Sequence, residues 1–142
     1  YQVPPPVAQP RLADFGDVIR LRGFGLAQGG TPSRSANIKL YWEVRADPAR
    51  NYTLFLHVIG PDGRRYVQLD LPYPTSTWPA HRFQTTDVPL ALPASAPPGQ
   101  YQVIIGLYDP ATGQRLTVRA ADATDPAFDG PDAVLLTRIE LK

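Results

Sequence analysis

The sequence predicts an all-β protein, folded as an antiparallel two-sheet β-sandwich of about seven to nine strands with immunoglobulin-like or jelly-roll-like connectivity. Three observations predict it. Apolar residues recur at every second position, turn-forming Pro, Gly and Asp residues separate these runs, and no window shows the apolar stripe of an amphipathic helix. The clearest example is Leu92–Tyr108, where a Pro/Gly turn precedes a strand that directs Tyr101, Val103 and Ile105 to one face.

A proline-rich segment, Tyr1–Pro10, predicts an extended linker without hydrophobic periodicity of its own. We expect one β-sandwich domain over residues 11–142, because a chain of 142 residues suffices for a single two-layer core. The sequence contains no Met, so we also expect it to be part of a longer protein. The strand-like runs are Asp17–Leu26, Asn37–Arg45, Tyr52–Ile59, Arg64–Leu69, Phe83–Leu90, Gln100–Tyr108, Arg115–Arg119 and Val134–Leu141.

The first two runs differ in regularity. Asp17–Leu26 contains Gly23 and Gly25, which are typical of a bulge or a turn. Asn37–Arg45 alternates cleanly between apolar and polar residues, so one face should be buried within an antiparallel sheet. Its apolar positions, with the tryptophan expected in the core, are Ile38, Leu40, Trp42 and Val44.

Tyr52–Ile59 is largely apolar on both faces, which predicts a central strand. Within it we expect His57 to be a hydrogen-bonded histidine of the core or of the space between the sheets. Pro-Asp-Gly at 61–63 suits a tight turn, since Pro presets φ and Gly accepts positive φ. This turn leads into Arg64–Leu69 as the antiparallel partner.

The later runs follow the same logic. Phe83–Leu90 is a further short strand, and Gln100–Tyr108 opens with Tyr101 at a tyrosine-corner position, where a buried ring bonds nearby backbone through its hydroxyl. Residues 109–113 form a longer hairpin turn before Arg115–Arg119. Val134–Leu141 closes the sandwich.

Composition limits the classes of function. The formal net charge is +1 and only 19% of residues are charged, which does not indicate a nucleic-acid-binding surface. No apolar run has the length of a membrane span, so we expect no direct membrane insertion by this segment. The chain has no cysteine and two histidines, so it offers no thiolate and no usual zinc ligand set, and we expect no cofactor.

Two long loops are where a binding site is expected, because long loops in compact domains are often functional. The first, Pro72–Arg82, combines aromatic rings, on which a sugar could stack, with polar groups for its hydroxyls. The alternative is that the tryptophan folds back and closes one end of the core. The candidate glycan-binding residues are Tyr73, Trp78, His81 and Arg82.

The second long loop, Ala120–Ala133, is acidic. Its carboxylates supply hard oxygen ligands for calcium, although their spacing is not that of an EF-hand. The alternative is ordinary Asp-Pro and Asp-Gly turn chemistry. The candidate calcium ligands are Asp122, Asp125, Asp129 and Asp132.

The sequence does not indicate an enzyme. The serines lack the nucleophile-elbow context of an acyl-transfer triad. A glycoside hydrolase needs two carboxyl groups about 5–10 Å apart. Glu43 and Glu140 are the only glutamates, and the sequence cannot place any two carboxylates together, so this alternative stays open.

Several segments in order resemble one family. They include IKLYWEV (38–44), FLHVIGPDGR (55–64), and PPGQY followed by GLYDPATGQRL (97–101 and 106–116). The chain resembles the C-terminal β-sandwich domain of Chloroflexus-type membrane proteins related to dolichyl-phosphate-mannose-dependent glycosyltransferases.

This resemblance implies a location and a partner rather than a reaction. It implies an extracytoplasmic domain, tethered to the cell membrane through the rest of a parent protein that holds the catalytic groups. We therefore expect a non-catalytic accessory or interaction domain, with the membrane-embedded part of the parent or a glycan as partner. The alternatives are a carbohydrate-binding module using the loop from Tyr73 to Arg82, and a glycoside hydrolase-like enzyme.

Overall fold

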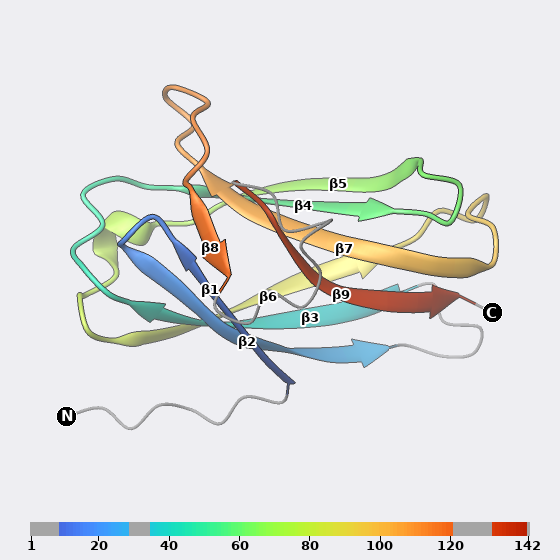
Figure 1. The fold of residues 1–142 in the computed structure, drawn as a ribbon, viewed down its shortest axis with the longest axis horizontal. Coiled ribbons are helices and arrows are strands. Elements are labelled where there is room, and N and C mark those ends of the chain that lie inside the picture. Colours follow the sequence, from blue (N-terminus) through green and yellow to red (C-terminus); the bar gives the residue numbers. More distant parts are fainter. Residues whose placement is uncertain (1–8, 29–34, 121–131, 142) are drawn as a thin grey trace.

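The structure, a computed structural model, describes residues 9–28, 35–120 and 132–141. Two antiparallel sheets face each other across one core, which confirms the predicted all-β sandwich (Figure 1). The five-stranded sheet has the order β6 (Phe83–Ala91), β3 (Ser35–Val44), β2 (Ile19–Gln28), β1 (Gln9–Phe15) and β8 (Val118–Ala120). The four-stranded sheet has the order β5 (Arg65–Pro72), β4 (Thr53–Ile59), β7 (Gly99–Tyr108) and β9 (Val134–Leu141).

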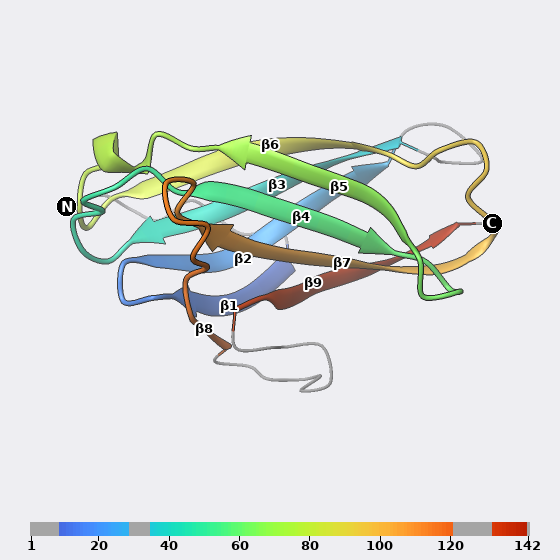
Figure 2. The ribbon, with the colours of Figure 1, turned by 90° about the horizontal axis from the view of Figure 1, so that it is seen from above.

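The chain joins the sheets by repeated crossing. Strands β1 to β3 form a meander in one sheet, and β4 and β5 form a hairpin in the other. Each later strand then changes sheet: β6 lies beside β3, β7 beside β4, β8 beside β1 and β9 beside β7. Seen from above, the strand directions of the two sheets are rotated against each other, as expected when twisted sheets pack face to face (Figure 2).

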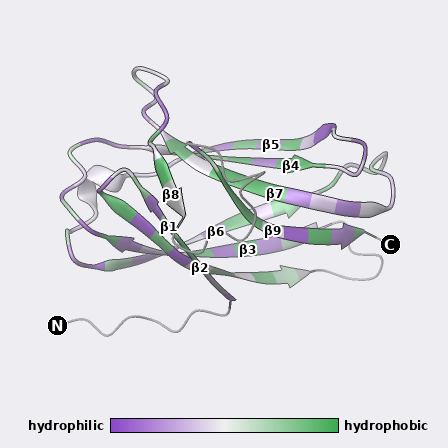
Figure 3. Ribbon diagram, in the orientation of Figure 1, coloured by the Kyte–Doolittle hydropathy of each residue, from purple (hydrophilic) through white to green (hydrophobic). Residues whose placement is uncertain are grey.

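The alternation of apolar and polar residues along each strand determines which face of the strand is buried in the core. The inward side chains of β3 and β4 are fully buried, and hydrophobic and hydrophilic residues alternate visibly along the strands (Figure 3). Tyr101 is fully buried, and its hydroxyl donates to the Pro97 carbonyl, which confirms the predicted tyrosine corner. The buried residues that these two strands contribute to the core are Ile38, Leu40, Trp42, Val44, Leu54, Leu56 and Val58.

One strand was not predicted from the sequence. β1 begins at Gln9, inside the segment predicted as a linker, and it places Ala13 and Phe15 in the core. It carries a proline and charged residues, and its register shifts between Pro10 and Ala13, so its alternation is too short to recognise. Residues 1–8 of the predicted linker lie outside the described residues.

Helical structure in the ranges 9–28, 35–120 and 132–141 is limited to one 3-10 turn, Thr75–Thr77. No helix in those ranges has the length and hydropathy needed to cross a membrane.

Candidate functional site

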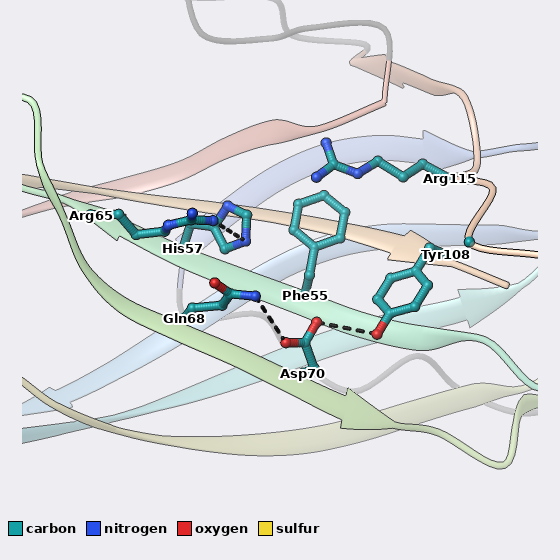
Figure 4. Close-up of a pocket in the computed structure, with 8 residues that line it drawn as sticks. Phe55, His57, Arg65, Gln68, Asp70, Tyr108 and Arg115 are labelled. Carbon is teal, nitrogen blue, oxygen red and sulfur yellow. Dashed lines mark hydrogen bonds between the residues drawn. The ribbon is translucent and has the colours of Figure 1, made fainter. Parts of the chain in front are cut away.

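A hollow lies on the outer face of the four-stranded sheet, on the side away from the core (Figure 4). Its volume is about 240 Å³, and it is open to solvent. Strands β4, β5 and β7 and the hairpin after β7 contribute its walls. We call this site the hollow, and its lining residues are Phe55, His57, Arg65, Gln68, Asp70, Tyr108, Gly113 and Arg115.

Strand register brings the floor of the hollow together. On β4, Phe55 and His57 face away from the core because their neighbours Leu54 and Leu56 face into it. Across β5, Phe55 pairs with Asp70 and His57 pairs with Gln68. The sheet therefore sets two polar side chains beside two rings without any contribution from loops.

Phe55 forms the base of the hollow, and a glycine makes room for it. On β7, Gly106 pairs with Phe55, and a Cβ at Gly106 would lie 2.2 Å from Cζ of Phe55. The ring consequently lies over the backbone of β7 and is only 3% exposed. Rings of His57 and Tyr108 flank it, with centroids 5.1 and 6.4 Å from that of Phe55.

Asp70 is the acceptor at the centre of a small polar network. Tyr108 donates its hydroxyl to Oδ1 of Asp70 at 3.2 Å, and Nε2 of Gln68 donates to Oδ2 at 3.3 Å. Burial, followed by the charge of Asp70, raises the pKa of Tyr108. The phenol therefore remains protonated near neutral pH, and the carboxylate is held by two neutral donors.

His57 is a neutral ring in this setting. Burial, followed by the positive charges of Arg65 and Arg115, lowers the pKa of His57. Nη1 of Arg65 lies 3.4 Å from Nε2 of His57, and a guanidinium can only donate, so Nε2 acts as acceptor. The sequence predicted a core or inter-sheet histidine, whereas the structure places His57 half-buried on the outer face.

The hairpin after β7 carries the second guanidinium to the hollow. Asp109 closes this turn, accepting the backbone N–H of Gly113 on its carbonyl and that of Ala111 on its carboxylate. Arg50 donates to the Asp109 carboxylate at 2.7 Å, and this hydrogen bond lowers the pKa of Asp109. These hydrogen bonds define the turn, and Arg115 follows it and lines the hollow.

Arg115 lies over the base of the hollow. Its guanidinium carbon is 4.2 Å from the centroid of the Phe55 ring, a cation–π distance. Nη1 also lies 3.4 Å from Oδ1 of Asp132, and both side chains of this pair are more than 40% exposed. With His57 neutral, the lining residues carry two positive charges, on Arg65 and Arg115, and one negative charge, on Asp70. Asp132 adds a second carboxylate, beside Arg115 and outside the lining.

The predicted glycan loop is arranged differently. Tyr73 and Trp78 are 9% and 8% exposed, and their rings pack on each other in the core with centroids 5.7 Å apart. Burial raises the pKa of Tyr73 to about 12, and its hydroxyl bonds Oγ1 of Thr86. This burial argues against stacking on a sugar and fits the alternative in which Trp78 closes one end of the core.

The other two predicted residues of that loop stay on the surface. His81 and Arg82 are exposed, while their backbones extend the pairing of β3 through Val44. His81 has φ of 63°, in the left-handed region. Glycan binding by this loop stays a prediction, and of its four candidate residues His81 and Arg82 are the exposed ones.

Three of the four predicted calcium ligands lie in a segment that the structure does not describe. Asp122, Asp125 and Asp129 lie outside the described residues, and Asp132 contacts Arg115. Within the part of the chain that the structure describes, no group of three or more metal-ligating side chains occurs. The calcium site stays a prediction.

The hollow itself was missed by sequence reasoning, although a signal existed. The outward positions of β4 carry Phe55 and His57, where a solvent-facing strand usually carries polar residues. Tyr108 lies outward on β7 as well. Aromatic residues on the outer face of a central strand indicate a covered or binding surface.

Comparisons with known proteins leave the family open. No family model matches the sequence, and no curated protein matches it. Among solved structures, one match is a crystal structure described as a "putative beta-galactosidase" from Bacteroides fragilis, with 15% sequence identity and a TM-score of 0.45. The match covers 69% of this chain and 15% of that chain. This likeness is too distant to bear on function.

Proposed function

We propose that this chain is a non-catalytic carbohydrate-binding accessory domain, and that the hollow is its binding site. The observation that carries the proposal is the lining: aromatic rings lie next to planar polar side chains that are held in place by hydrogen bonds to one another. Such a surface is prepared before a ligand arrives, which reduces the entropy lost on binding.

The chemistry of the lining suits a sugar. A pyranose presents C–H groups on its faces and hydroxyls, each both donor and acceptor, on its rim. The part-exposed ring of Tyr108 offers an apolar surface, and Asp70 and Gln68 offer acceptors and donors beside it. The volume of about 240 Å³ is below the ~300–1,000 Å³ of sites for drug-sized ligands, which suits one sugar ring or the end of a chain.

The same lining supports a binding role rather than catalysis. Hydrolysis of a glycosidic bond needs two carboxyl groups on either side of the scissile bond. Asp70 is the one carboxylate among the lining residues that the structure describes, and its two oxygens already accept from Tyr108 and Gln68. The nearby Asp132 is directed to Arg115.

The cellular setting in this proposal comes from the sequence resemblance. An extracytoplasmic domain tethered to a membrane glycosyltransferase-like parent would meet glycan acceptors or products outside the membrane. In that setting the hollow would hold a glycan near the catalytic part of the parent, and no cofactor is needed.

Calorimetric titration of the 142-residue chain against a panel of bacterial and plant oligosaccharides tests this proposal. We expect saturable binding that falls about tenfold or more in Gln68→Ala and Tyr108→Ala, since each removes a polar group from the hollow. The double variant His81→Ala/Arg82→Ala is the matched control and should bind like the parent.

Two results would contradict the proposal. Loss of binding in the control alone would move the site to the Tyr73–Arg82 loop. Absence of binding across the panel would favour an interaction domain, with the parent protein as partner.

A further inference from the structure

The hollow carries two guanidinium groups at different points of its rim. Figure 4 shows Arg65 beside His57 and Arg115 above Phe55, with Asp70 on the other side of the Phe55 ring. We infer that the hollow selects acidic carbohydrate, that is, a sugar whose ring bears a carboxylate, such as a uronic acid. This inference rests on the proposed function, which it makes specific.

Neither guanidinium is neutralised by the carboxylate of the hollow. Both oxygens of Asp70 accept from the neutral donors Tyr108 and Gln68. Arg65 instead contacts the ring of His57, which carries no charge to offset it. The lining residues therefore carry one net positive charge, which a carboxylate on the ligand would neutralise once it replaces Asp132 at Arg115.

The ion pair of Arg115 leaves it available to a ligand. Its contact with Asp132 is 3.4 Å long, and the two side chains are 42% and 43% exposed. Exposed pairs of this kind contribute little, roughly 0–1 kcal/mol. A guanidinium has five N–H donors, and the contacts with Asp132 and His57 use one nitrogen each of Arg115 and Arg65.

The orientation of Arg115 also favours a planar anion. Its guanidinium lies 4.2 Å from the centroid of Phe55, and that ring is itself held over Gly106. A guanidinium supported on a ring loses less freedom when it forms two parallel N–H···O bonds to a carboxylate. A neutral sugar would satisfy these donors only with hydroxyls, which accept weaker hydrogen bonds.

The test compares each acidic oligosaccharide with its own neutral form. Galacturonic acid oligomers would be titrated beside the same oligomers after reduction of the carboxyl groups to hydroxymethyl groups, so that linkage and length stay equal. We expect the acidic form to bind about tenfold tighter, because charge-assisted hydrogen bonds are worth more than neutral ones. Dextran sulfate serves as a non-specific polyanion and should bind more weakly than the galacturonic acid oligomers.

Two variants connect the preference to the hollow. Arg65→Gln and Arg115→Gln should each lower affinity for the acidic oligomer about tenfold and leave affinity for the reduced oligomer within about twofold. Arg64→Gln is the matched control: it removes the same charge from an exposed neighbour outside the lining and should change neither affinity. Arg65 is exposed, so its substitution should not disturb the fold.

Each other outcome has a distinct meaning. Equal or tighter binding of the reduced oligomer would overturn the acidic preference while the carbohydrate-binding proposal stands. An equal loss in Arg64→Gln, or tighter binding of dextran sulfate, would show general attraction of polyanions and overturn the inference. No binding of either oligomer, or of any sugar in the wider panel, would overturn both.

Discussion

At the scale of single residues, the hollow depends on groups whose protonation state is set by their neighbours. His57 is kept neutral by burial and by two guanidinium groups, and Tyr108 is kept protonated by burial and by Asp70. At the edge of the core, Oγ1 of the half-buried Thr86 accepts from both Nε1 of Trp42 and the hydroxyl of Tyr73, each at 3.0 Å. The first network leads to a prediction about the pH dependence of stability, and the second to a prediction about the effect of a substitution on stability.

The depressed pKa of His57 predicts how stability depends on pH. In the unfolded chain His57 takes up its proton near pH 6.5, but the folded protein takes it up only at lower pH. Between these two values the unfolded state binds more protons, so stability falls as pH falls below about 6.5. His57→Gln should flatten this part of the curve of unfolding free energy against pH. An NMR titration of His57 with a midpoint at or above 6.5 would contradict the prediction.

We expect substitutions at two neighbouring threonines of β6 to differ clearly in their effect on the free energy of unfolding. Thr86→Val keeps the shape of the side chain but removes the shared acceptor of two buried donors. We expect a loss of about 1–3 kcal/mol in the free energy of unfolding, measured by chemical denaturation. Thr85→Val is the control, since Thr85 is exposed, and it should change stability by less than about 0.5 kcal/mol. Equal effects of the two variants would argue against the network.

At the scale of elements, the outer face of the four-stranded sheet is shaped by a pairing between β4 and β7. Phe55 occupies the space that a side chain at Gly106 would need. The glycine is therefore required by a close approach of a ring and not by its backbone conformation. The same approach places Phe55 where Arg115 can cover it.

Gly106→Ala should displace Phe55 and open the base of the hollow. The new Cβ would meet the ring at 2.2 Å and the Asp132 carbonyl at 2.8 Å. We expect a loss of about 1–3 kcal/mol in the free energy of unfolding, together with weaker ligand binding. The double variant Gly106→Ala/Phe55→Leu should recover part of the stability, because the smaller side chain relieves the clash. Strict additivity of the two single changes would show that the contact is not the cause.

At the scale of the whole molecule, the two sheets share one core and the chain crosses between them repeatedly. Trp42 on β3 and Trp78 in the loop before β6 belong to that same core, linked through the ring of Tyr73. Because the two sheets share this core, we expect them to unfold in one cooperative transition. Two rings of the loop that the sequence marked as a site, Tyr73 and Trp78, thus belong to the common core.

The variant Trp78→Ala tests whether Trp78 belongs to this shared core. We expect it to lower the free energy of unfolding by about 3–5 kcal/mol, as removal of large core aromatics does, and to leave ligand affinity of the folded variant unchanged. In the parent, the unfolding transitions followed by tryptophan fluorescence and by far-ultraviolet circular dichroism should coincide. Separate transitions would indicate that the sheets unfold independently. A small effect of Trp78→Ala combined with lost binding would restore the loop as the site.

The sequence by itself determined the fold class, most strand positions and the buried face of each regular strand, because period-two alternation and turn chemistry are local properties. The alternation around Trp42 and the corner at Tyr101 are examples. It did not reveal β1, whose alternation is short and interrupted by a proline and a register shift.

Only the tertiary structure decided which outward residues meet. Phe55, Asp70, Tyr108 and Arg115 come from four separate segments, and strand register and sheet crossing bring them together. It also decided that Trp78 turns into the core. Both outcomes depend on pairing between distant parts of the chain, which local patterns do not encode.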